Sequence, residues 1–160
     1  MQEVRSVDTE IILLVEDNQD HAVMVQALLD YHGISRRVQV TQGIAEAKAY
    51  LLGQWPFDDT SRYPRPRLII LDHWLNDGTG LDLLEWVAER LELRSIPVVV
   101  FTGCRDSVVR DRALALGADD FLVKPEGFED LGLAIERLVR PGDSGRSRRR
   151  SDGTQTERAS

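Results

Sequence analysis

The chain has 160 residues, of which 42% are hydrophobic, so it can form one domain with its own core and is too short for two. Its formal net charge of -7 gives no general reason to expect binding to nucleic acid or to an anionic membrane. Because it has a single cysteine, no secretion signal and no run of about 20 apolar residues, we expect neither an internal disulfide nor a membrane span, and we expect a cytoplasmic location.

The first half of the chain alternates between expected strands and expected helices. The run IILLV at 11–15 is branched and apolar without polar alternation, which is typical of a parallel strand buried on both faces. In chain order we expect a strand at 10–15, a helix at 18–32, a short strand at 36–40 and a helix at 43–52. Residues 54–66 carry three prolines, which fit neither a helix interior nor a central strand, so an exposed loop is expected there. The sequence leaves open whether this loop contacts a partner or only connects.

The second half continues the alternation. In it we expect strands at 67–71, 96–101 and 119–123 and helices at 80–91, 106–116 and 127–139. Strands that alternate with helices favour an open parallel sheet covered by helices on both faces. The expected fold is therefore a doubly wound α/β domain with five strands and five helices.

The two ends of the chain differ from this domain in composition. Residues 1–9 are polar, and residues 141–160 are rich in Gly, Ser and Arg and lack an apolar run. We expect the domain to span 10–140 and the C-terminal segment to be a disordered tail. The cluster from Arg146 to Arg150 could contact nucleic acid or an acidic partner, but its composition favours a solvated tail.

Polar residues follow or end four of the expected strands: Glu16, Asp17, Asp72, Thr102 and Lys124. Because the carboxyl ends of parallel strands meet at one edge of an open sheet, we expect these side chains to lie together. Each alone has an ordinary structural interpretation, such as a helix start, a turn, a cap or a surface lysine. Their combination at one edge predicts a functional site.

The residue types indicate the chemistry of this site. Two carboxylates about 4 Å apart repel by roughly 4 kcal/mol at an effective dielectric of 20, so Glu16, Asp17 and Asp72 call for a cation. Carboxylate oxygens favour a hard ion, and Mg²⁺ binds carboxylates together with phosphate oxygens. A carboxylate can also attack phosphorus to form an aspartyl phosphate, with Lys124 pairing with the phosphate oxygens. We therefore predict a phosphorylation switch with Asp72 as nucleophile.

The added phosphoryl charge could draw the Thr102 hydroxyl inward and leave a space into which Phe121 turns. The change would then reach the outer surface formed by the helix at 106–116, the strand at 119–123 and the helix at 127–139. This surface is the expected read-out face. An aromatic residue in a strand is more often simply part of the core, so Phe121 retains that alternative.

Residues 10–139 resemble the receiver domains of two-component response regulators. The resemblance rests on LLVEDN at 13–18, LIILD at 68–72, VVVFTG at 98–103 and GADDFLVKP at 117–125. It implies the flavodoxin-like strand order 2-1-3-4-5. It also implies these roles: phosphoacceptor Asp72, acidic metal pair Glu16 and Asp17, switch hydroxyl Thr102, phosphate-pairing Lys124, switch aromatic Phe121, and a metal-binding backbone carbonyl at Trp74.

By the same resemblance, the domain takes its phosphoryl group from a sensor histidine kinase or a small phosphodonor and loses it by hydrolysis that it promotes itself. The resemblance therefore implies a phosphoacceptor that dephosphorylates only itself, and not an enzyme that turns over a separate substrate. The opening VEDNQD, the proline-containing insertion and the lack of an output domain are most similar to the small regulators that partner bacterial phytochromes. Several of those form homodimers through the read-out face, so a homodimer is expected.

Some positions depart from the family pattern. Asn76 replaces a common proline, Trp74 is bulky near the phosphoacceptor, and Cys104 lies two residues after Thr102, so the lifetime of the phosphoryl group stays open. The three histidines, His21, His32 and His73, are expected to be structural, with His73 pointing away from the site. Two other functions stay open: a receiver-like docking module that never carries phosphate, and a metal-dependent phosphohydrolase.

Overall fold

The computed structural model describes residues 10–34, 37–124 and 126–139. A five-stranded parallel sheet has the order β2-β1-β3-β6-β7, and β4 and β5 form a separate two-stranded hairpin. Without that hairpin the order is the expected 2-1-3-4-5, so the predicted fold is confirmed. The elements are β1 (Ile11–Val15), α1 (Gln19–Tyr31), β2 (Arg37–Thr41), α2 (Ile44–Leu52), β3 (Leu68–Leu71), β4 (Trp74–Leu75), β5 (Gly78–Thr79), α3 (Gly80–Ala88), β6 (Val98–Thr102), α4 (Ser107–Ala115), β7 (Asp120–Val123) and α5 (Phe128–Leu138).

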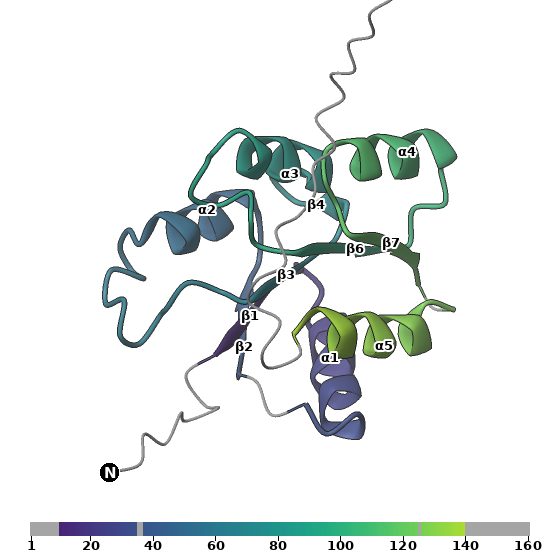
Figure 1. Ribbon diagram of the computed structural model, residues 1–160, viewed down its shortest axis with the longest axis horizontal. Helices are drawn as coiled ribbons and strands as arrows, with labels where there is room; N and C mark the ends of the chain where they lie inside the picture. The colour runs from purple at the N-terminus through teal and green to yellow at the C-terminus, as the bar shows by residue number, and fades with distance from the viewer. Residues whose placement is uncertain (1–9, 35–36, 125, 140–160) are drawn as a thin grey trace, which may run out of the picture.

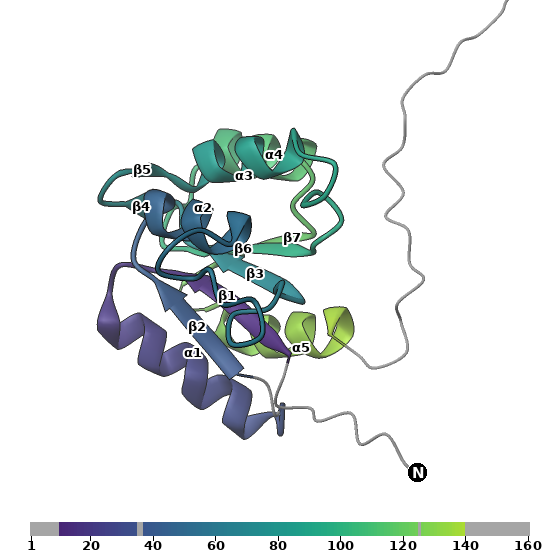
Figure 2. The ribbon, with the colours of Figure 1, turned by 90° about the vertical axis from the view of Figure 1, so that its left-hand side faces the viewer.

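The sheet lies between two layers of helices. Helices α2, α3 and α4 cover one face, and α1 and α5 cover the other (Figures 1 and 2). Alternate side chains of β1 separate into two cores accordingly: Leu13 packs in the cluster with α2 and α3, whereas Leu14 packs in the cluster with α1 and α5. Because β1 is buried on both faces, its sequence is apolar at every position.

The hairpin of β4 and β5 was not predicted, because strands of two residues leave no hydrophobic pattern. It is followed directly by α3, whose start is fixed by a capping box: the Asp82 N–H donates to Thr79 Oγ1 at 3.3 Å, and the Thr79 N–H donates to Asp82 Oδ2 at 3.1 Å. Helix α3 ends at Ala88, three residues before the expected end. The connection from β3 to α3 is therefore ordered rather than a simple loop.

The proline-containing loop at 54–66 has no helix or strand, as expected, but it is not uniformly exposed. Phe57 is buried, and its ring lies 5.1 Å from the rings of both Tyr50 and Tyr63. The Tyr50 hydroxyl donates a hydrogen bond to the Pro64 carbonyl at 2.7 Å. The expectation of an exposed loop therefore needs correction, because this aromatic cluster anchors the loop to α2.

The predicted N-terminal segment at 1–9 and the predicted tail at 141–160 lie outside the described residues. Among the residues that the structure describes, no helix is long and apolar enough to cross a membrane.

Candidate functional site

Four of the predicted site residues sit at the carboxyl edge of the parallel sheet. The Glu16 N–H donates to the Thr41 carbonyl at 2.9 Å, so β1 stays paired with β2 one residue past its end. Asp72 is held in the same way against β1 by the Val15 carbonyl, and Lys124 against β6 by the Thr102 carbonyl, at 3.1 and 2.8 Å. These backbone hydrogen bonds fix the Cα positions of the three residues, so their side chains start from neighbouring points on the same edge of the sheet.

The ammonium group of Lys124 lies at the centre of the site. Its Nζ is 2.6 Å from Glu16 Oε1, 2.9 Å from His21 Nδ1 and 3.3 Å from Asp72 Oδ2. An ammonium has three N–H donors and no acceptor, so the three contacts match its hydrogen-bonding capacity. The side chain of Lys124 is 7% exposed, that of Glu16 is 3% and that of Asp72 is 10%, so the charges are largely withdrawn from water.

The electrostatics of this group leave an excess of negative charge. Burial raises the pKa of the Glu16 carboxyl above its usual 4.5, the hydrogen bond from Lys124 opposes this rise, and the charge of Asp72 adds to it. With both carboxylates ionised, one ammonium cannot balance two charges. The site therefore favours a further cation.

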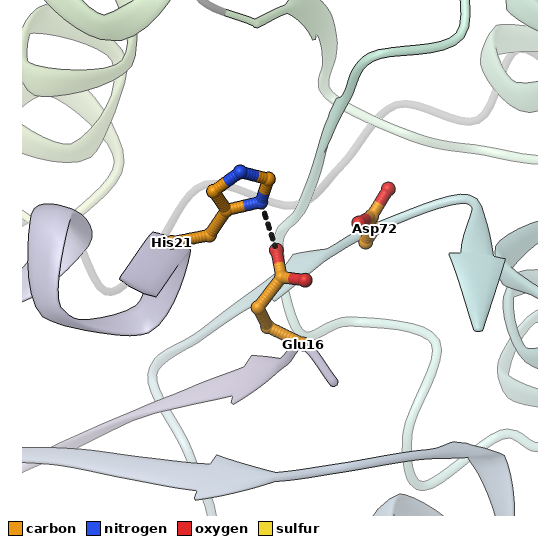
Figure 3. A group of neighbouring side chains, drawn as sticks. All are labelled: Glu16, His21 and Asp72. Atoms are coloured by element: carbon orange, nitrogen blue, oxygen red, sulfur yellow. Dashed lines mark ion pairs between the residues drawn. The ribbon is translucent and has the colours of Figure 1, made fainter. Parts of the chain in front are cut away.

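Oxygen and nitrogen donors suited to a metal gather here. Among the described residues, Glu16, His21 and Asp72 each offer a ligand atom, and these atoms all lie within 4.8 Å of one another. Figure 3 shows His21 of α1 and Glu16 after β1 pointing toward each other, with Asp72 beside them at the end of β3. Asp17 lies half-buried in the loop after Glu16 and is not part of this group, so its predicted metal role stays a prediction.

His21 was expected to be structural, and its proximity to Lys124 was missed. A signal was present in the sequence, because His21 falls in the first turn of a helix that begins at the functional edge of the sheet. The direction of its ring could not be obtained from that position alone.

Thr102 and Phe121, the predicted switch residues, are both buried. Thr102 Oγ1 accepts a hydrogen bond from the Cys104 N–H at 3.2 Å. The Phe121 ring belongs to the core cluster that includes Ala113 of α4. The structure thus places both beside the expected read-out face, while their switching roles stay predictions.

The residues after Asp72 form a compact turn. The His73 N–H donates to Asp72 Oδ1 at 2.7 Å, and the His73 ring packs edge-on against Trp74 with centroids 4.5 Å apart. Burial lowers the pKa of His73 below its usual 6.5, although the charge of Asp72 opposes this. The Trp74 side chain is 60% exposed, and the predicted metal contact of its carbonyl stays a prediction.

Residues 12–136 match the sequence model of the response regulator receiver domain. The chain belongs to the response regulator receiver family. The probable methanogenesis regulatory protein FilR2 of Methanothrix harundinacea (strain 6Ac) is 31% identical over 131 residues, which are 82% of each chain. The two-component response regulator ORR5 of Oryza sativa subsp. japonica is 38% identical over 77 residues, which are 48% of this chain and 58% of ORR5. This receiver therefore spans only part of some relatives.

Solved structures of small bacteriophytochrome regulators are similar to this receiver. The bacteriophytochrome response regulator RtBRR has a TM-score of 0.71 and 32% identity, covering 81% of this chain and 78% of RtBRR. The bacteriophytochrome response regulator AtBRR has a TM-score of 0.70 and 31% identity over 82% and 93% of the two chains. The Mn²⁺-bound form of response regulator Rcp1 has a TM-score of 0.72 and 27% identity over 82% and 96%. The resemblance predicted from the sequence is confirmed.

Proposed function

We propose that this receiver accepts a phosphoryl group on Asp72 from a sensor histidine kinase and signals by changing its association with a partner. The observation that carries the proposal is the position of the Lys124 ammonium, 3.3 Å from Asp72 Oδ2 inside a buried group of charges. A positive charge held beside a strand-end carboxylate can stabilise a phosphoryl group as it arrives.

The two oxygens of Asp72 have different surroundings. Oδ1 accepts the His73 N–H, which fixes the rotation of the carboxylate, while Oδ2 faces Lys124. When a carboxylate oxygen bonds to phosphorus, the bond from phosphorus to the donor's histidine nitrogen breaks and that nitrogen keeps the electron pair. Lys124 then forms an ion pair with the phosphoryl oxygens and stabilises their negative charge.

The donor set of the site fits Mg²⁺, because the two buried carboxylates of Glu16 and Asp72 share a single ammonium and offer oxygen ligands close together. We assign Glu16, Asp17, Asp72 and the Trp74 carbonyl as the residues that hold it. When bound, Mg²⁺ supplies positive charge that offsets repulsion between the carboxylates and the phosphoryl oxygens. His73 and Lys124 orient the nucleophile independently of the ion.

The read-out is proposed to run through Thr102 to the face formed by α4, β7 and α5. Thr102 Oγ1 accepts the Cys104 N–H, and its own O–H is a donor that a phosphoryl oxygen can attract. Movement of Thr102 would change the packing of Phe121 beneath α4.

We propose that the face formed by α4, β7 and α5 is the interface of a homodimer. The phosphodonor is proposed to be a bacterial phytochrome kinase. The protein is proposed to act in the cytoplasm and to promote its own dephosphorylation.

Phosphorylation is tested by incubating the purified chain with acetyl phosphate and Mg²⁺ and measuring its intact mass. We expect a gain of one phosphoryl mass that is absent from Asp72→Asn and from a sample containing a chelator. No gain in the native chain, followed by no transfer from an autophosphorylated phytochrome kinase, would contradict the proposal and favour a docking module without phosphate.

A further inference from the structure

His21 makes a contact with Lys124 that none of the assigned roles explains. It lies in the first turn of α1, where its backbone N–H donates to the capping Asn18 Oδ1 at 3.1 Å. From this fixed backbone position the ring points back toward the sheet edge and Glu16 (Figure 3). Nδ1 lies 2.9 Å from Lys124 Nζ and 3.7 Å from Glu16 Oε1.

The short distance to Lys124 determines what the imidazole does. An ammonium can only donate, so Nδ1 of His21 must accept, which requires a neutral ring that carries its proton on Nε2. The His21 side chain is 38% exposed, whereas Glu16 is 3% exposed. His21 therefore forms the solvent-facing side of the Lys124 environment.

Without His21, the contacts of Lys124 would be unequal. Glu16 Oε1 lies 2.6 Å from Nζ and Asp72 Oδ2 lies 3.3 Å away, so the stronger attraction draws the ammonium toward Glu16. Nδ1 of His21 lies 2.9 Å from Nζ and 3.7 Å from Glu16 Oε1, so the two contacts meet Nζ at nearly a right angle, and His21 fixes the direction of a second N–H of the ammonium. Two donors are then taken by Glu16 and His21, and the third is directed at Asp72.

We propose that His21 is a positioning residue that holds the Lys124 ammonium beside Asp72, and so speeds phosphoryl transfer without contacting the phosphoryl group. The inference rests on the proposed function of Asp72 as the phosphoacceptor. Asn in place of His21 should preserve the effect, because Asn Oδ1 is an acceptor at nearly the position of Nδ1. Ala should not, because it removes the acceptor.

The experiment measures the phosphorylation rate with acetyl phosphate and Mg²⁺ by intact mass. We expect His21→Ala to be about threefold to tenfold slower than the native chain, the range set by the net loss of one ordinary hydrogen bond at a partly exposed site. His21→Asn should stay within about twofold of the native chain on the same grounds. Gln26→Ala, an exposed change on α1, is the matched control and should leave the rate unchanged.

A double variant separates positioning from a general structural role. Adding His21→Ala to Lys124→Arg should slow the reaction less than it slows the native chain, because the longer Arg side chain no longer presents an ammonium to Nδ1. Equal slowing in both backgrounds, a native rate for His21→Ala, or an Asn variant as slow as the Ala variant would overturn the inference. No phosphorylation of the native chain, either by acetyl phosphate or by an autophosphorylated phytochrome kinase, would overturn the proposed function, and this inference with it.

Discussion

Lys124 and Glu16 form a buried ion pair, with Nζ 2.6 Å from Oε1 and side chains that are 7% and 3% exposed. Removing two charges from water is costly, so such a pair adds little to stability by itself. Breaking it is costly as well, because the remaining charge is left buried. A substitution of either residue in the functional site should therefore also change the stability of the fold.

Replacing Lys124 by Met should lower the free energy of unfolding by about 3–5 kcal/mol, because Glu16 and Asp72 lose their shared cation. Adding Glu16→Gln should restore part of the loss by removing one unpaired carboxylate. Urea unfolding of the single and double variants forms a double-mutant cycle. Simple additivity of the two changes would contradict this account.

An exposed ion pair of the same length is the matched control. Arg105 and Glu126 are also 2.6 Å apart, but their side chains are 63% and 64% exposed. Because solvent screens such pairs, Arg105→Gln should leave the urea midpoint nearly unchanged.

Mg²⁺ binding should depend on Asp17 although this residue lies outside the group around Lys124. Losing a carboxylate next to a divalent ion removes several kcal/mol of attraction at short range, so Asp17→Asn should weaken Mg²⁺ binding by more than about tenfold. Asp20→Asn, an exposed change in the first turn of α1, is the control. Equal Mg²⁺ affinities of the two variants in calorimetric titrations would show that Asp17 is not a ligand.

Asp77 should stabilise the fold as a remote cap of α2. Its carboxylate accepts the N–H groups of Ile44 and Ala45 at 2.8 and 3.0 Å, where the N-cap residue Gly43 has no side chain to do so. Asp77→Ala should lower the free energy of unfolding by about 1 kcal/mol at neutral pH, as for other helix caps.

The same backbone hydrogen bonds hold the pKa of Asp77 below its usual 3.8, and the bond from the Ala45 N–H has a larger effect than the bond from the Ile44 N–H. The ionised form is thus the stabilising one, and its contribution is present above pH 3.8 and is lost as pH falls through the lower pKa of the folded state. The stability difference between the native chain and Asp77→Ala should therefore shrink as pH falls below 3.8. A difference that is constant with pH would contradict this role.

Gly80 should be intolerant of a side chain because it packs against the residue that carries the site. A Cβ at Gly80 would collide with the Asp72 carbonyl oxygen and lie 3.0 Å from His73 Cα, both backbone atoms. Gly80→Ala should lower the free energy of unfolding by about 1–3 kcal/mol, as overpacking does. Gly103, which has no atom within 4 Å of such a Cβ, is the control. Equal urea midpoints of the two Ala variants would refute this.

The sequence predicted the parts of the structure that depend on local pattern. Apolar runs located β1, β3, β6 and β7. Strand ends located Glu16, Asp72 and Lys124 at one edge, where the structure brings them together. The aromatic anchoring of Phe57 was hidden, because a proline-rich segment shows no periodicity. The contact of His21 with Lys124 was also hidden, because it depends on how α1 packs across the sheet edge.

The central claim is that Asp72 carries the phosphoryl group, and its most direct test is chemical mapping. Borohydride reduces an aspartyl phosphate to homoserine, which peptide mass spectrometry can locate in the chain after phosphorylation with Mg²⁺ present. The account predicts homoserine at position 72 and at no other position. Homoserine at another carboxylate, or its persistence in Asp72→Asn, would contradict it.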